Sequence, residues 1–421
     1  MLDQPYDLVR LLSRRLPPAA GIERIRLRRL RALCDYAFRN VPYYRRLFES
    51  AGLRPADIRE VADLRLLPYS RREDLRDAGT GRISQAVDPE SCRRLYSSGS
   101  TGQPWPVWRT PLEDRLRRAV ELRSMAAAGI GPGDRIVTLG PVVENARPTL
   151  GRFGLYRTRF VSPKLPVEQQ AKQLQDLQPT VFWVYPTALR ALLNEVGALE
   201  GIIRPRMVVT SAEPLDEPLR QRLLAGAPLQ LRNFYGTVEL GRVAWSCGAG
   251  EGLHINTDCC IVELDESETV PGAGRPVIVT NLNSWASPYI RFRVGDRVEL
   301  VAGPCSCGSP LPLMKPPTGR EWDVISLPGG RQMAPWAFNS IFRSLPGLLQ
   351  FRVTQKSLDR LLVQLQFSAA PGAHDLRTLR GRLENQLGEP MTVELETVDR
   401  FVDDRLKFRA FVSELPRTET P

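Results

Sequence analysis

Apolar residues recur along the chain with two different periods, and the change between them divides the sequence into regions. Up to about residue 90, apolar positions follow a helical period near 22–39, 42–51 and 70–78, and prolines interrupt the pattern. Residues 112–129 carry a further long helical pattern. The first part of the chain is therefore predicted to be mostly helical.

From residue 134 to about 230, short apolar runs alternate with helical stretches. Such alternation indicates βαβ units around a parallel sheet, so the predicted fold class is α/β. The predicted strands are 135–139, 181–184 and 207–210, and the predicted helices are 167–177, 187–199 and 217–224.

After residue 240 the pattern changes to short strands and turns, and after residue 320 to a small α+β pattern. The proline-rich stretch 310–319 lies between the two and is the best candidate boundary. We therefore expect a large domain of βαβ layers plus a small β-rich subdomain over 1–318, and a small α+β domain over 319–421. The predicted strands are 260–264, 276–281, 289–293, 296–301, 350–354, 361–367 and 391–398, and the predicted helix is 374–387.

Composition places the chain among globular proteins, with 421 residues of which 42% are hydrophobic and 25% charged. No apolar run approaches the ~20 residues that cross a bilayer, and the N-terminus lacks a secretory pattern. We therefore expect a cytoplasmic protein without a membrane span. The net charge of +11 comes mostly from arginines spread over the whole chain, which argues against a nucleic-acid partner but leaves a basic nucleic-acid binder as an alternative.

The segment with the clearest chemistry is 96–104, Tyr-Ser-Ser-Gly-Ser-Thr-Gly-Gln-Pro. Hydroxyl residues interleaved with glycines let backbone N–H groups and side chains point at one anion, as a polyphosphate requires. The segment lacks the Gly-Lys-Ser/Thr ending of a Walker loop, and a plain surface turn is the alternative interpretation. The candidate phosphate-binding residues are Ser97, Ser98, Gly99, Ser100, Thr101 and Gly102.

Further motifs follow this loop in a fixed order. Together with 41–45 and 67–76, they make the chain resemble the adenylate-forming (acyl-CoA synthetase) enzymes, and more narrowly their phenylacetate–CoA ligase-like (CapK-type) branch. The resemblance covers nearly the whole chain. The motifs are Ser-Ala-Glu-Pro at 211–214, Tyr-Gly-Thr-Val-Glu at 235–239, Arg-Phe-Arg-Val-Gly-Asp at 291–296, Gly-Arg at 319–320, and a late lysine, Lys407.

The resemblance implies a ligase that works in two steps. A carboxylic acid, aromatic or hydrophobic, would attack the α-phosphate of ATP and release pyrophosphate, and the acyl group would then pass to CoA. The C-terminal domain would swing between the two steps. An amine, an alcohol or a carrier protein as acceptor, and a weakened nucleotide-binding relative, are the alternatives; a homodimer is compatible with the sequence.

The resemblance also assigns roles to single residues. Lys407 would stabilise charge in the transition state, and Glu239 would bind Mg²⁺. Tyr235 would lie against adenine, and Asp296 would accept hydrogen bonds from the ribose. The other implied contacts are Ala212, Glu213, Gly236, Thr237 and Arg320 to the nucleotide, and Tyr185 and Phe234 to the acid.

Four positions depart from the pattern of the family. Val238 and Val294 replace hydroxyl residues, and Gln103 replaces a lysine. Each lost hydrogen bond to a charged group would slow the first step roughly 10- to 150-fold if nothing replaced it. The bulky Trp322 stands at the expected hinge, which puts the full domain alternation in doubt.

Cysteines and histidine form one further pattern, because five of the seven cysteines fall between 247 and 307. Three thiolates and one imidazole make a tetrahedral zinc set, which would be structural because no ligand position stays open. Cys259 and Cys260 are alternative ligands, and buried thiols beside a ligand-contacting histidine are the alternative interpretation. The predicted zinc ligands are Cys247, His254, Cys305 and Cys307.

Overall fold

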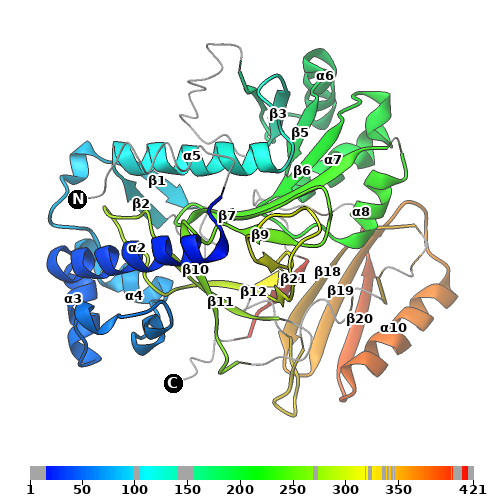
Figure 1. Cartoon of the computed structure of the whole chain (residues 1–421). Coiled ribbons are helices and arrows are strands. Elements are labelled where there is room, and N and C mark those ends of the chain that lie inside the picture. The colour runs from blue at the N-terminus through cyan, green and yellow to red at the C-terminus, as the bar shows by residue number, and fades with distance from the viewer. Residues whose placement is uncertain are drawn as a thin grey trace.

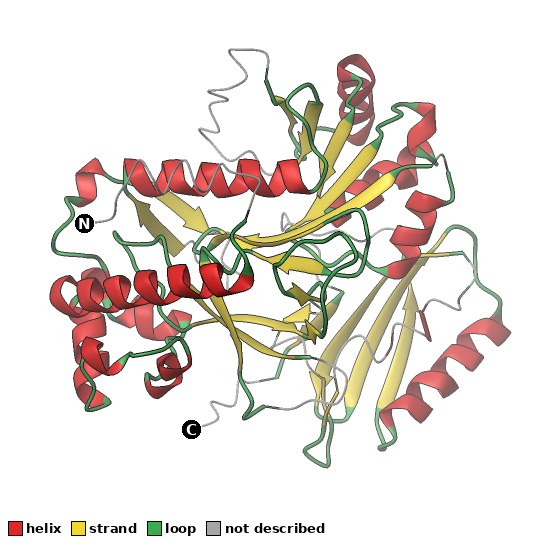
Figure 2. Ribbon diagram, in the orientation of Figure 1, coloured by secondary structure: helices red, strands yellow, loops and turns green. Residues whose placement is uncertain are grey.

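Two parts with separate hydrophobic cores make up the structure, which is a computed structural model (Figure 1). The larger part carries the N-terminal helices, a nine-stranded sheet and a four-stranded sheet, and the smaller part is a second four-stranded sheet with a helix against it (Figure 2). The structure describes residues 16–97, 105–140, 155–226, 228–268, 274–317, 319–320, 325–333, 338, 341–342, 345, 347–399, 401 and 410–415.

The chain begins with helices at the predicted places: α2 (Ala19–Asn40), α3 (Pro42–Ser50) and, after an irregular stretch, α4 (Arg72–Asp77). The apolar stripe of α2 is buried, as the helical period requires. Between α2 and α3, Val41 is extended, and Pro42 starts the new helix at a position where its missing N–H costs nothing.

A nine-stranded sheet forms the centre of the larger part. Strands β4, β3, β5, β6 and β7 are parallel in that order, and β8, β9, β14 and β13 continue the sheet antiparallel. The α/β prediction is therefore confirmed. The bounds are β3 (Arg135–Leu139), β4 (Arg157–Val161), β5 (Val181–Val184), β6 (Met207–Ser211), β7 (Gln230–Thr237), β8 (Gly241–Ser246), β9 (Leu253–Ile255), β13 (Leu300–Val301) and β14 (Leu313–Met314).

Helices cover both faces of this sheet. Val208 packs in one core with side chains of the helices α6, α7 and α8, and the next residue, Val209, packs on the other face with Met125 of α5. Successive side chains of a strand point to opposite faces, so a fully apolar run marks a strand buried on both. The helix bounds are α5 (Pro111–Ala127), α6 (Val167–Leu177), α7 (Pro186–Val196) and α8 (Glu217–Leu224).

A second sheet has the order β10 (Cys260–Leu264), β11 (Arg275–Asn281), β12 (Phe292–Val298) and β15 (Gly319–Arg320). The expectation of two strands at 289–293 and 296–301 is wrong. A single strand, β12, runs through the predicted break by way of a bulge at residues 294–296, where Gly295 adopts a left-handed φ of 85°.

The predicted boundary stretch 310–319 pairs with both sheets of the larger part. Its residues 313–314 form β14, which is hydrogen-bonded between β9 and β13, and Gly319 starts β15. Strand β14 therefore belongs to the nine-stranded sheet, and β15 pairs with the second sheet of the larger part.

A separate antiparallel pair, β1 (Arg93–Ser97) and β2 (Trp105–Arg109), brackets the hydroxyl- and glycine-rich segment. The register pairs Ser97 with Trp105. Residues 98–104 lie outside the described residues.

The smaller part is a four-stranded sheet of order β20, β19, β18, β21, against which α10 packs (Figure 1). It meets the larger part at α7, where the Arg190 guanidinium donates to the Leu349 carbonyl and pairs with Asp216. No helix in the described ranges is long and apolar enough to cross a bilayer. The bounds are β16 (Ile325–Ser326), β17 (Gln332–Met333), β18 (Leu348–Ser357), β19 (Arg360–Phe367), α10 (Ala373–Leu387), β20 (Thr392–Thr397) and β21 (Phe411–Ser413).

Candidate active site

The Tyr235 segment lies where the central sheet changes from parallel to antiparallel. Gly236 stands across from Arg242 in the β7–β8 hairpin, and a Cβ at Gly236 would lie 2.2 Å from the Gly241 carbonyl oxygen. Only glycine permits this close approach. The Thr237 hydroxyl accepts a hydrogen bond from the Leu240 N–H, which holds the turn.

Asp296 comes from the second sheet and meets this segment. The Tyr235 hydroxyl donates to the Asp296 carboxylate over 2.9 Å, although 61 residues separate them. Both side chains are buried, and Asp296 is paired with Arg320 in the β12–β15 register. Three motifs that are remote in sequence therefore meet here; of Arg320, only the backbone is described.

Glu239 is almost fully buried, at 2% exposure. Its carboxylate accepts a hydrogen bond from the Arg72 guanidinium of α4, with Nη2–Oε1 at 2.9 Å. The sequence alone did not identify this partner, because Arg72 resembles the many other arginines of the chain, which were expected to face solvent. A buried carboxylate held in place by a cation can also ligate a metal ion if the cation yields.

The Ser211–Glu213 turn leaves the end of β6. Ala212 has a left-handed φ of 68°, which alanine rarely adopts and which marks a constrained turn. The Glu213 carboxylate accepts hydrogen bonds from the N–H and the hydroxyl of Thr187, at 2.8 and 2.7 Å. It thereby satisfies a free N–H in the first turn of α7, where a negative charge is also favoured.

The aromatic residues near the predicted acid contacts Tyr185 and Phe234 lie on two different faces of the sheet. The rings of Trp183 and Phe234 pack at 4.9 Å between centroids, and the Trp183 indole N–H donates to the Ser211 hydroxyl. Tyr185 stands at the N-cap of α7, where burial first and the nearby Glu213 carboxylate second raise the pKa of its hydroxyl. Phe182 points into the core on the opposite face of the sheet and is not available to a ligand.

Val238 and Val294 have a structural explanation, since both pack in the core that also contains Tyr235. The Val238 carbonyl accepts a hydrogen bond from Arg109. The hydroxyls that the family has at these positions are thus replaced by apolar packing.

Several predicted residues cannot be placed. Ser97 is the last residue of β1, but its side chain is not described. Outside the described residues lie Ser98, Gly99, Ser100, Thr101, Gly102, Gln103, Trp322 and Lys407.

The predicted zinc ligands lie together beside the central sheet. Their four ligand atoms all lie within 4.8 Å of one another. The sulfurs of Cys247 and Cys305 are 3.6 Å apart, and Cys307 Sγ lies 3.3 Å from His254 Nε2. Zinc bonds of 2.3 Å to sulfur and 2.0 Å to nitrogen in a tetrahedron require separations of about 3.5–3.8 Å, which these two distances approach, so the four groups could hold the ion.

The surroundings of the cluster support a metal. His254 Nδ1 lies 3.4 Å from the Leu311 carbonyl, which leaves Nε2 for the cluster. The alternative ligands lie elsewhere: Cys259 contacts the Arg123 guanidinium, and Cys260 belongs to the hydrophobic core.

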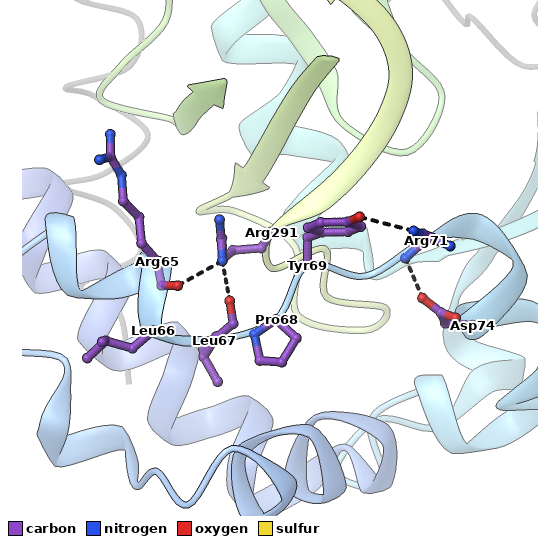
Figure 3. A pocket seen from close by; sticks show the side chains of 8 residues that line it. All are labelled: Arg65, Leu66, Leu67, Pro68, Tyr69, Arg71, Asp74 and Arg291. Atoms are coloured by element: carbon purple, nitrogen blue, oxygen red, sulfur yellow. Dashed lines mark hydrogen bonds between the residues drawn. The ribbon is translucent and has the colours of Figure 1, made fainter. Parts of the chain in front are cut away.

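A shallow hollow of about 450 Å³ lies outside these two sites, beside the segment that precedes α4 (Figure 3). Arg291 donates there to the carbonyls of Arg65 and Leu67, and the Tyr69 hydroxyl accepts from Arg71. The groups that could bind a ligand are thus largely engaged with the protein itself.

A profile of the AMP-binding enzyme family matches residues 54–283. Phenylacetate-coenzyme A ligase of Thermus thermophilus is 30% identical over 330 residues, which cover 74% of this chain and 73% of the relative. The chain belongs to the AMP-binding enzymes.

Within the AMP-binding enzymes it lies in the phenylacetate–CoA ligase-like branch. The phenylacetate-coenzyme A ligase of Escherichia coli is 28% identical over 392 residues, 87% of this chain and 89% of that one. The fold resembles that of 2-hydroxyisobutyryl-CoA ligase in its postadenylation state, with a TM-score of 0.79, 20% identity, and coverage of 95% of this chain and 90% of that one. The predicted family and fold are therefore confirmed.

Proposed function

We propose that the chain is an ATP-dependent, AMP-forming ligase that activates a carboxylic acid and transfers the acyl group to CoA. The main support is the contact between Tyr235, Asp296 and strand β15, which brings residues of three family motifs together. Membership of the AMP-binding enzymes and the likeness to phenylacetate-coenzyme A ligases support the same reaction.

The roles of the residues follow from their chemistry. Asp296 would accept the ribose hydroxyls, with Tyr235 fixing the carboxylate and presenting its ring to adenine. Segment 97–102 and Arg320 would hold phosphates, and Ala212, Glu213, Gly236 and Thr237 would line the nucleotide. Tyr185 and Phe234 would contact the acid.

The catalytic groups would act on the α-phosphate. When bound, Mg²⁺ would offset the negative charge of the phosphates, and Glu239 would be its protein ligand. Lys407 would stabilise the charge that develops as a carboxylate oxygen bonds to the α-phosphorus and pyrophosphate leaves.

We also propose a division into two domains at residue 318, with β15 just after it pairing back onto β12, and a C-terminal domain that moves between the two steps. The core of the smaller part supports this division, because its described members all come from Ile325 onward. A structural zinc at Cys247, His254, Cys305 and Cys307 completes the proposal; it rests on the spacing of the donor atoms.

Pyrophosphate release on a panel of aromatic and aliphatic acids, with and without CoA, tests the reaction. We expect release that requires the acid and Mg²⁺, and a CoA thioester when CoA is added. Release without thioester would favour another acceptor. No release with any acid would refute the proposal.

A further inference from the structure

A charge pair lies beside Phe234, one of the two predicted acid contacts. Arg242 lies on β8, opposite Gly236 in the hairpin. Its guanidinium stacks over the Phe234 ring at 4.6 Å from the centroid and over the Trp183 ring at 5.5 Å. Cation–π contacts of this kind fix the guanidinium against Phe234, which would contact the acid, and against its neighbour Trp183.

Glu121 of α5 holds the other end of this pair. Arg242 donates to it twice, with Nε–Oε2 at 3.0 Å and Nη2–Oε1 at 2.7 Å. The side chains of Arg242 and Glu121 are 12% and 24% exposed, so the pair is partly buried. Burial alone would raise the pKa of Glu121, but Arg242 and Arg117 outweigh it and lower that pKa, which keeps Glu121 ionised.

The pair has hydrogen-bonding capacity left over. Among the described residues, the Nη1 group of Arg242 has no hydrogen-bond partner, and each Glu121 oxygen can accept a further bond. Partly desolvated charges with unused donors and acceptors cost free energy unless a ligand or water satisfies them. A ligand hydroxyl can satisfy both residues, because it accepts from Arg242 and donates to Glu121. An amine only donates, and a carboxylate only accepts.

We propose that the enzyme selects aromatic acids that carry a ring hydroxyl, and that Arg242 and Glu121 bind this hydroxyl. The proposal rests on the function proposed above and names its substrate class. Tyr185, which lies near Arg242, and Phe234 would contact the ring.

ATP–pyrophosphate exchange tests the proposal, because it reports adenylation without any acyl acceptor. Benzoate, phenylacetate and cinnamate would each be compared with their hydroxylated counterparts, with the hydroxyl at the 3 or 4 position. For at least one pair, the wild type should favour the hydroxylated acid about 10- to 100-fold in kcat/KM. In Arg242→Met the ratio should fall to about one.

Two further variants complete the design. The double variant Arg242→Met/Glu121→Met replaces the whole pair by apolar groups, which proteins often tolerate, and serves if the single variant unfolds. Arg118→Met, on the exposed side of the same helix, should leave the ratio unchanged. No exchange with any acid would refute the ligase function itself. Exchange without a hydroxyl preference, or a preference that survives the loss of the pair, would overturn the substrate class alone.

Discussion

The guanidinium of Arg72 donates a hydrogen bond to the carboxylate of Glu239 over 2.9 Å, across 167 residues of sequence. The Glu239 side chain is 1% exposed and that of Arg72 is 15% exposed. The residue that we propose as the Mg²⁺ ligand is thus held by a cation from the N-terminal helices.

Replacement of Arg72 by methionine should destabilise the protein by about 3 kcal/mol, because it leaves a buried carboxylate without its partner. Urea unfolding measures the loss. Arg72→Lys keeps the charge and should recover part of the stability. An unfolding midpoint for Arg72→Met equal to that of the wild type would contradict the importance of the pair.

Tyr235→Phe should weaken nucleotide binding without unfolding the protein. The change removes only the hydroxyl that donates to Asp296. We expect the KM for ATP to rise about 10-fold, as the loss of a hydrogen bond to a charged group implies. Tyr36→Phe is the matched control, since it also removes a hydroxyl contact, to Ser84, in the N-terminal helical part. Equal KM values for the two variants would argue against the role of Tyr235.

Purified protein should contain one zinc ion per chain, measured by elemental analysis. Cys305→Ser should lose the ion and lower the unfolding temperature, whereas Cys92→Ser, at a cysteine outside the cluster, should do neither. At a free zinc concentration about 1,000 times the Kd, binding contributes about 4 kcal/mol to stability. Zinc-free protein from chelator-free purification would rule out the site.

Asp134 should make stability depend on acid pH. Burial alone would raise its pKa, but hydrogen bonds from Arg206, the Gly131 N–H and the Thr180 hydroxyl outweigh this and lower the pKa of Asp134. A lowered native-state pKa stabilises the protein above the unfolded-state pKa of about 4, and the contribution disappears as pH falls through the native value.

Asp134→Asn should therefore cost about 1 kcal/mol at pH 6, a modest figure because the Arg206 side chain is 42% exposed to screening. Its difference from the wild type should shrink below pH 4. Urea midpoints between pH 3 and pH 7 measure this, with the exposed Asp77→Asn as control. A difference independent of pH would show that the Asp134 charge is not what matters.

The sequence was most informative where burial repeats with a fixed period. Strands β3 and β5 have the predicted bounds, since apolar side chains on both faces leave no other arrangement for such short runs. It misled at 289–301, because a glycine usually marks a turn, yet Gly295 keeps its place in β12. The strand continues through a bulge there, which accommodates the left-handed glycine.

At the site, the sequence indicated residue types but not their partners. The order of the motifs predicted Tyr235, Asp296 and Glu239 as site residues, and the spacing of the cysteines predicted the zinc ligands. Arg72 and Arg242 gave no signal, because an arginine that pairs with a distant carboxylate looks the same in sequence as one that faces solvent.

Helix α7 contacts both the Ser211–Glu213 turn and the smaller part of the structure. Its first turn is held by Glu213, and Arg190, three residues after Thr187, donates to the Leu349 carbonyl of β18. A helix this short resists bending because its backbone hydrogen bonds join successive turns. The Ser211–Glu213 turn and the smaller sheet are thus both attached to one short, stiff helix.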